Sequence, residues 1–278
     1  MTHDPVAQTA PHKVVIMARG LGTRMRKSVE GVSLTADQAA AASAGVKAMI
    51  SLDDRPFLDY VISALADAGF DEFCLVIGPE HNVIRDYYDS CEKSRLSIVY
   101  AVQEHPLGTA DAVAAAEEFA GDDRVLVVNS DNFYPEDAVA RLREVPASGT
   151  LGFTKRAMIA QSNIDPERIR AFALLDSDDS GQLTDIIEKP DPHIVDAAGE
   201  TALVSMNCFL LTPRIFEACR SIDKSERGEY EIVDAVRWMV EHGEHFDVVP
   251  VESGVLDMSI RGDITSVVEA LSSREVKL

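Results

Sequence analysis

The chain has 278 residues, of which 46% are hydrophobic, and it carries a formal net charge of −21 at pH 7. This length suits one large α/β domain or two small ones, and the apolar fraction excludes wholesale disorder. The negative charge argues against nucleic acid or an anionic membrane as a partner, although a small anion could still bind in a local basic pocket.

Compartment and domain organisation follow from simple patterns. The four cysteines form no CxxC pair and are expected to be reduced, packed thiols. No apolar run approaches 18 residues, and the polar first eleven residues lack the apolar core of a signal peptide. We therefore expect a cytoplasmic protein with a loose tail at residues 1–11 and a single domain at residues 12–278. A homo-oligomer is possible.

Apolar runs and one-sided apolar spacing alternate along the chain. In order, they predict strand 14–17, helix 57–68, strands 73–77 and 98–102, helix 109–120, strand 125–128 and helix 135–143. Shorter strands at 171–175, 183–187 and 203–211 follow, then helices at 229–242 and from about residue 263. The alternation predicts an α/β fold with a mainly parallel sheet and helices on both faces.

An insertion-like piece at about residues 28–46 interrupts this pattern. Thr35 and Gln38 have the spacing of a capping box, and Gly45 is placed to end the helix. Two interpretations remain open, a surface helix without a role and a lid over the preceding glycine turn.

The glycine turn at Gly20–Arg24 follows the first strand. Between His12 and Arg55 there are seven Lys/Arg and four Asp/Glu, so this stretch is basic within an acidic chain. A dinucleotide fingerprint would need a glycine where Met25 stands, and the Walker pattern GxxxxGK[ST] does not occur. Two glycines and an arginine instead favour binding of a phosphate chain through backbone N–H groups and a guanidinium. Other polar segments, 103–109 and 129–131, also follow strands, so all three can converge at one sheet edge.

These motifs resemble, in order, those of the sugar-1-phosphate nucleotidyltransferases (nucleoside-diphosphate-sugar pyrophosphorylases). The resembling segments are MARGLGTRM at 17–25, KAM at 47–49 with RPFL at 55–58, Q103 with PLGTA at 106–110, SDN at 130–132, EKP at 188–190 and GEYEI at 228–232. The resemblance implies a Rossmann-like mixed, mostly parallel sheet of the glycosyltransferase-A-like kind. It also implies transfer of a nucleotidyl group to a sugar 1-phosphate with release of pyrophosphate and with Mg²⁺ as cofactor.

The resemblance also implies roles for particular residues. Those expected to bind the nucleotide are Ala18, Arg19, Gly20, Gly22, Thr23, Gln103, Gly108 and Thr109. Those expected to act on the reacting phosphates are Arg24, Lys47 and Lys189. Asp131 and Asp257 are the expected Mg²⁺ ligands, and Asn132, Glu188 and Asn207 are expected to face the sugar phosphate. The base loop resembles uridylyl-, adenylyl- and thymidylyl-transferring relatives alike, with a pyrimidine triphosphate favoured.

Four departures from the family pattern leave alternatives open. Arg19 stands where the family has a small residue, the gap from Arg24 to Lys47 is long, Asp257 lacks its usual tryptophan and glycine neighbours, and Ala171 replaces a glycine. A different acceptor, or a catalytically weak paralogue that serves as a binding or regulatory subunit, is therefore an alternative. A nucleotide-sugar glycosyltransferase is disfavoured because residues 129–133 read NSDNF and contain no DxD motif.

Overall fold

The computed structural model of the chain describes residues 10–20, 22–26, 34–52 and 54–278. Most of the predicted tail, residues 1–9, lies outside the described residues, and so does the first part of the predicted insertion, residues 28–33. Within the described ranges, no helix combines the length and the apolar character needed to cross a membrane.

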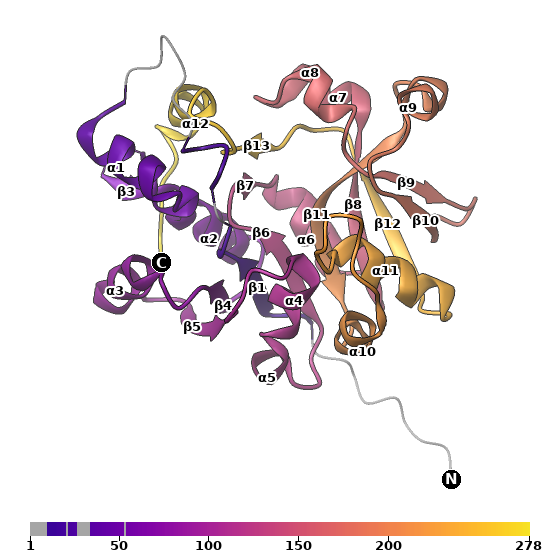
Figure 1. Ribbon diagram of the computed structural model, residues 1–278, viewed down its shortest axis with the longest axis horizontal. Coiled ribbons are helices and arrows are strands. Elements are labelled where there is room, and N and C mark those ends of the chain that lie inside the picture. Colours follow the sequence, from indigo (N-terminus) through magenta and orange to yellow (C-terminus); the bar gives the residue numbers. More distant parts are fainter. Residues whose placement is uncertain (1–9, 21, 27–33, 53) are drawn as a thin grey trace.

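A mixed sheet forms the centre of the described part of the chain (Figure 1). Its nine strands are β1 (Lys13–Met17), β4 (Glu72–Ile77), β5 (Ser97–Val102), β6 (Val125–Asn129), β8 (Ser148–Thr154), β9 (Leu174–Ser177), β10 (Leu183–Ile187), β11 (Leu203–Leu211) and β12 (Phe246–Val251). They lie in the order β10-β9-β11-β6-β1-β4-β5, and β12 joins through β8, which pairs with β11. Strands β6, β1, β4 and β5 are parallel, whereas β11 is antiparallel to β6, β8 and β9. The predicted mixed α/β sheet is confirmed.

Helices and two short ladders complete the described fold. The helices are α1 (Ala36–Ala44), α2 (Phe57–Asp67), α3 (Asn82–Ser90), α4 (Thr109–Ala114), α5 (Glu117–Ala120), α6 (Glu136–Arg143), α7 (Lys155–Gln161), α8 (Pro166–Ile169), α9 (Pro192–Ala198), α10 (Arg214–Ser221), α11 (Ile232–Glu241) and α12 (Asp263–Leu271), with a 3₁₀ turn at Lys47–Met49. The ladders join β2 (Ser51–Leu52) to β3 (Arg55–Pro56), and β7 (Asn132–Phe133) to β13 (Leu256–Asp257).

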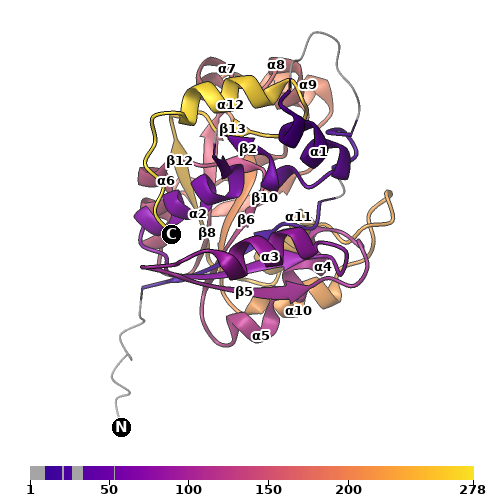
Figure 2. The ribbon, with the colours of Figure 1, turned by 90° about the vertical axis from the view of Figure 1, so that its left-hand side faces the viewer.

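Both faces of the sheet are covered because its strands are apolar on both faces. Along β1, Val14 and Ile16 belong to one buried cluster and Val15 and Met17 to the other, as the two-residue period of a strand requires. The first cluster includes side chains of α2, α6 and α12, and the second includes those of α4, α10 and α11. Figure 2 shows α2 and α12 on one side of the parallel strands and α5 and α10 on the other.

Three predicted elements differ from the structure. The predicted helix 229–242 begins only at Ile232, because the N–H of Tyr230 donates to Leu107 O and keeps this residue in the preceding loop. The predicted helix 109–120 is two helices, α4 and α5, and at the break between them the N–H of Ala116 donates to Val113 O, three residues back, instead of continuing the α-helical pattern. The predicted strand 171–175 begins only at Leu174, because the N–H groups of Ala171 and Phe172 donate to carbonyls of α8 and prolong its turn.

The ends of the parallel strands bring the predicted motifs to one edge of the sheet. Met17, the last residue of β1, is in register with Val76 of β4 and Asn129 of β6. Strand β5 ends beside β4 at Val102. The segments that follow β1, β5 and β6 therefore start side by side, as expected for the carboxyl edge of a parallel sheet.

Candidate functional site

A cavity of about 500 Å³ opens where β1, β5 and β6 end. The predicted site residues that line it are Ala18, Arg19, Gly20, Gly22, Thr23, Arg24, Lys47, Gln103, Gly108, Thr109 and Asp131. Five other predicted residues lie outside its lining, namely Asn132, Glu188, Lys189, Asn207 and Asp257. The cavity therefore collects the segments predicted to bind the nucleotide, whereas the residues predicted for the sugar lie beyond it.

The glycine turn is packed against the end of α1. Gly22 has φ +56°, and a Cβ at this position would lie 2.2 Å from the main-chain oxygen of Gly45. Gly45 caps α1 in the left-handed conformation, and the Thr35–Gln38 capping box forms at the other end, as the sequence predicts. Arg261 joins the two segments, because its Nε donates to Met25 O and its NH2 to Ser43 Oγ. The later part of the predicted insertion thus supports the turn.

Arg24 and Arg19 have different environments although both line the cavity. Arg24 is exposed, and among the described residues no carboxylate pairs with it. The Arg19 guanidinium is buried and donates to the main-chain oxygen of Gln103, while its NH2 lies 3.5 Å from the Glu80 carboxylate. Arg24 is thus the free cation of the turn, whereas the charge of Arg19 faces protein groups.

The segment after β5 is fixed by the loop that precedes α11. A Cβ on Gly108, whose φ is +120°, would lie 2.3 Å from Tyr230 O, so a glycine is required for this close approach. Tyr230 N donates to Leu107 O, and Ala110 N donates to Tyr230 O. The Thr109 hydroxyl accepts a hydrogen bond from the N–H of Ile232 at the start of α11. The Thr109 hydroxyl therefore stabilises the start of α11, although Thr109 lines the cavity.

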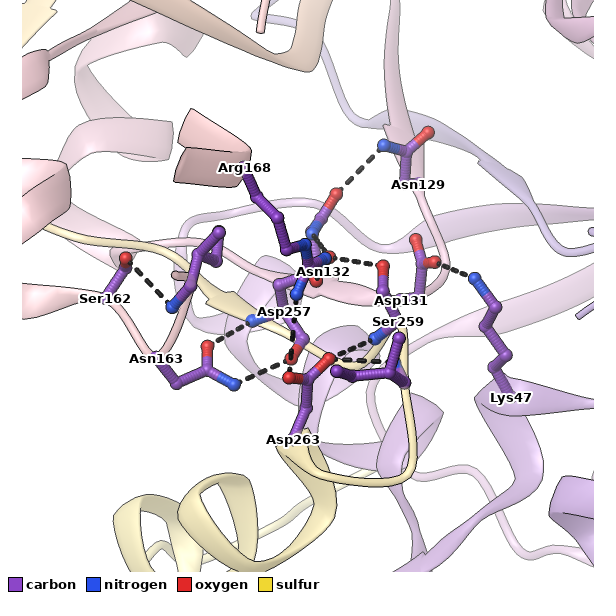
Figure 3. Close-up of polar contacts among 12 residues, drawn as sticks. Lys47, Asn129, Asp131, Asn132, Ser162, Asn163, Arg168, Asp257, Ser259 and Asp263 are labelled. Atoms are coloured by element: carbon purple, nitrogen blue, oxygen red, sulfur yellow. Dashed lines mark hydrogen bonds and ion pairs between the residues drawn. The ribbon is translucent and has the colours of Figure 1, made fainter. Parts of the chain in front are cut away.

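Asp131, in the turn before β7, and Asp257, on β13, lie close to cationic side chains (Figure 3). Lys47 Nζ lies 2.9 Å from Asp131 Oδ2. Asp257, which is paired in register with Asn132, lies 2.6 Å from Arg168 NH2 through its Oδ2. Each carboxylate predicted to bind metal thus has a cationic side chain beside it.

The Asp257 side chain is almost completely buried, with 5% of the residue exposed. Its Oδ1 accepts hydrogen bonds from Asn132 Nδ2 and Ser259 Oγ, both at 2.9 Å. Burial and the nearby negative charge of Asp131 raise the pKa of Asp257 to about 6, although Arg168 opposes this rise. The two carboxylates therefore repel each other, which is an arrangement that a divalent cation would relieve.

The residues predicted for the sugar phosphate share unusual backbone geometry. Lys189 at φ +46° and Asn207 at φ +54° are the described non-glycine residues with positive φ. Asn207 lies where the register of β11 against β8 shifts, and its N–H donates to Ser205 Oγ. Burial, followed by the negative charge of Glu231, raises the pKa of Glu188. Left-handed conformations at residues other than glycine cost free energy and cluster at functional sites. Lys189 and Asn207 therefore remain candidates for binding the sugar phosphate.

Sequence reasoning missed the residues that hold Asp257. The Asn163 side chain makes two hydrogen bonds to the backbone of Asp257. Its Nδ2 donates to Asp257 O and its Oδ1 accepts from Asp257 N, both at 2.8 Å. Arg168 comes from α8 and also lies 3.6 Å from Asp263. No sequence spacing connects these positions to Asp257. The sequence at 161–168 is polar, but its flanks are also charged, so this stretch did not stand out as a partner of Asp257.

Comparison with known proteins gives one family. Residues 13–255 match the family described as Nucleotidyl transferase. A UTP–glucose-1-phosphate uridylyltransferase of Haloferax volcanii is 28% identical over 90% of this chain and 93% of its own length. A glucose-1-phosphate thymidylyltransferase of Streptomyces griseus is 29% identical over 83% of this chain, which spans 58% of that relative. A low-salt glycan biosynthesis nucleotidyltransferase of Haloferax volcanii is 30% identical, and this chain spans 64% of it.

Solved structures agree with the fold. A UDP-glucose pyrophosphorylase complexed with UDP-glucose superposes with a TM-score of 0.73, with 95% of this chain and 100% of that chain covered at 16% identity. A UTP-bound UDP-glucose pyrophosphorylase from Acinetobacter baumannii gives the same TM-score at 17% identity, with 96% and 95% covered. At these identities the likeness concerns the fold alone.

Proposed function

Because this chain belongs to the nucleotidyl transferase family, we propose that it joins a sugar 1-phosphate to UTP or dTTP and releases pyrophosphate. The relatives named for glucose 1-phosphate favour that sugar, or a close analogue, as the acceptor. One observation carries the proposal: the glycine turn, the Lys47–Asp131 pair and Gln103 line a single cavity. A triphosphate and its base need those three elements together.

The environment of Gln103 supports a base with an imide N–H. Gln103 Nε2 donates to Gly108 O at 3.0 Å and to Asp111 Oδ2 at 2.7 Å, so the carboxamide nitrogen is committed to two acceptors. No donor among the described residues reaches Oε1, which leaves this oxygen as an acceptor. Uracil and thymine present a donor at N3, whereas cytosine presents an acceptor at the same place. Gln103 would therefore accept UTP or dTTP and disfavour CTP.

The reaction needs positioning and charge neutralisation rather than a covalent enzyme intermediate. A phosphate oxygen of the sugar 1-phosphate attacks the α-phosphorus in line and forms the new P–O bond. The bond from the α-phosphorus to the oxygen bridging to the β-phosphorus breaks, and pyrophosphate leaves with the electron pair. Backbone N–H groups of the glycine turn and the exposed Arg24 would hold the leaving phosphates, and Lys47 would neutralise the growing charge.

Asp131 and Asp257 fit a magnesium ion shared with the nucleotide. Among the described residues no group of three or more His, Cys, Asp or Glu could hold a metal by itself. Mg²⁺ commonly takes one or two carboxylates and completes its shell with phosphate oxygens and water. The mutual repulsion that contributes to the raised pKa of Asp257 is consistent with such a site. When bound, the ion would neutralise charge on the reacting phosphates.

The acceptor would lie beyond the cavity, toward β10 and β11. Lys189 is the proposed cation for the sugar phosphate, and Glu188, Asn207 and Asn132 are the proposed partners of the sugar or its phosphate. Arg227 is a further proposed cation for the sugar phosphate. It pairs with Glu231, whose negative charge contributes to the raised pKa of Glu188. Its guanidinium is half exposed and could turn toward a phosphate.

Pyrophosphate release with Mg²⁺, five nucleoside triphosphates and a panel of sugar 1-phosphates tests the proposal. We expect UTP or dTTP with glucose 1-phosphate to be the fastest pair. Asp131→Asn should lower kcat/KM at least about 100-fold, as losses of one electrostatic group in an active site commonly do. Asp123→Asn is the matched control, because Asp123 also pairs with a lysine, Lys13 at 2.8 Å, but outside the cavity. Nucleotide binding without pyrophosphate release for any pair would instead support the regulatory alternative.

A further inference from the structure

The side chain of Arg19 joins two parts of the cavity that are far apart in sequence. Arg19 stands at the start of the glycine turn, and only 7% of its side chain is exposed. Its NH1 donates to the main-chain oxygen of Gln103, 84 residues away. The Glu80 contact is longer, at 3.5 Å, and Glu80 is half exposed, so that pair contributes little. The buried contact to Gln103 is therefore the one that matters.

The local fold makes room for this arginine. A Cβ on Gly78, which follows β4, would lie 2.7 Å from Arg19 Nε and 2.5 Å from Glu80 Oε2. Any larger residue at position 78 would therefore press on the Arg19 guanidinium and on the Glu80 carboxylate. The course of the Arg19 side chain is thus built into the edge of the sheet, between the ends of β1 and β5.

Gln103 is held at every polar group except one. Its N–H donates to Ile77 O at 2.9 Å, and its main-chain oxygen accepts from Arg19. Its carboxamide nitrogen donates to Gly108 and Asp111. Removing the arginine would leave a buried carbonyl without its charged donor, next to the side chain that faces the base.

We propose that Arg19 is a positioning residue for base selection, which fixes the main chain of Gln103 so that its carboxamide oxygen meets the imide N–H of the base. This inference rests on the proposed function, because it takes Gln103 as the residue that contacts the base. Arg19 acts through Gln103 and does not bind the triphosphate. Arg24, Lys47 and the backbone N–H groups of the turn neutralise the charge of the triphosphate. Preorganisation of one acceptor then separates UTP from CTP.

Binding titrations without acceptor, using UTP, CTP and tripolyphosphate as probes, test this inference. In Arg19→Ala we expect UTP affinity to fall about ten-fold, the preference for UTP over CTP to shrink by a similar factor, and tripolyphosphate affinity to stay within about two-fold. Arg19→Lys, which keeps a cationic donor, should recover part of the preference. Arg95→Ala is the control, because Arg95 also donates to main-chain oxygens, those of Ser63 and Lys277, and lies away from the cavity.

A double-mutant cycle separates positioning from direct contact. Once Gln103→Ala has removed the carboxamide, adding Arg19→Ala should change the UTP/CTP ratio by less than about two-fold. Equal losses for UTP and tripolyphosphate in Arg19→Ala would show that Arg19 binds phosphate and would overturn the inference. So would an unchanged UTP/CTP ratio in Arg19→Ala or, if that variant does not fold, in Arg19→Met, which keeps an apolar stem without a donor. Failure of the wild-type protein to bind any triphosphate would instead contradict the proposed function.

Discussion

Replacing Gly22 by alanine tests whether the glycine turn depends on its contact with α1. Two costs add. Alanine in the left-handed conformation, at φ +56°, costs about 1 kcal/mol relative to glycine. The new Cβ would also start 2.2 Å from Gly45 O, and a real Cβ contact needs at least 3.0 Å, so main chain must move against main chain.

The second cost is of the overpacking kind, about 2 kcal/mol, so the total is about 3 kcal/mol. For a chain of this size that corresponds to a fall in Tm of roughly 6–12 °C. Gly243→Ala is the matched control, since Gly243 has φ +81° at the end of α11 and nothing within 4 Å of its hypothetical Cβ, and the Glu244 N–H donates to Met239 O as it does after a left-handed residue at a helix end. It should cost about 1 kcal/mol and lower Tm by roughly 2–4 °C.

Thermal unfolding and steady-state kinetics measure the two consequences separately. Gly22→Ala should lower Tm more than Gly243→Ala, and it should raise KM for the triphosphate because the turn that holds the phosphates has shifted. Gly243→Ala should leave KM unchanged. If both variants share the same Tm and the same KM, the Gly22–Gly45 contact does not shape the site and the reasoning is wrong.

Three further predictions concern the acids and the base loop. Affinity for Mn²⁺, measured by calorimetry with a nucleotide present, should be full well above pH 6 and should fall as pH drops through about 6, because protons then compete for Asp257. Arg168→Met should move that midpoint to higher pH, because Arg168 lowers the pKa of Asp257; an unmoved midpoint would contradict this pairing. Thr109→Val should lower Tm by roughly 2–4 °C through the lost cap of about 1 kcal/mol on α11, and an unchanged Tm would show that the cap contributes nothing.

The regular part of the fold could be predicted because periodicity reports burial directly. The predicted helix 57–68 and the strands 183–187 and 203–211 agree with the structure to within one residue, since each carries enough apolar residues to mark a buried face even where Asp185 or Asn207 interrupts them. The break between α4 and α5 could not be predicted. It lies at Ala115–Ala116 within a run of alanines, and alanines give no signal of where a helix turns.

The candidate site was predictable where it follows strand ends and unpredictable where it depends on side-chain direction. The edge of a parallel sheet brings together any segments that follow its strands, so the meeting of the glycine turn, Gln103 and Asp131 needed only the strand order. The direction of Arg19 depends on the space left by Gly78 and on an acceptor in another loop. Sequence spacing carries no information on either.

The basic turn of this acidic protein is less basic than its sequence indicates. Lys47 is paired with Asp131 and Arg19 with the Gln103 carbonyl and Glu80, whereas Arg24 has no acidic partner among the described residues. Within the part of the turn that the structure describes, a triphosphate alone would therefore meet Arg24 without a carboxylate partner and the backbone N–H groups. Freeing Lys47 requires something else to neutralise Asp131. Triphosphate and divalent cation should accordingly bind with positive coupling, each raising the affinity of the other by the same factor.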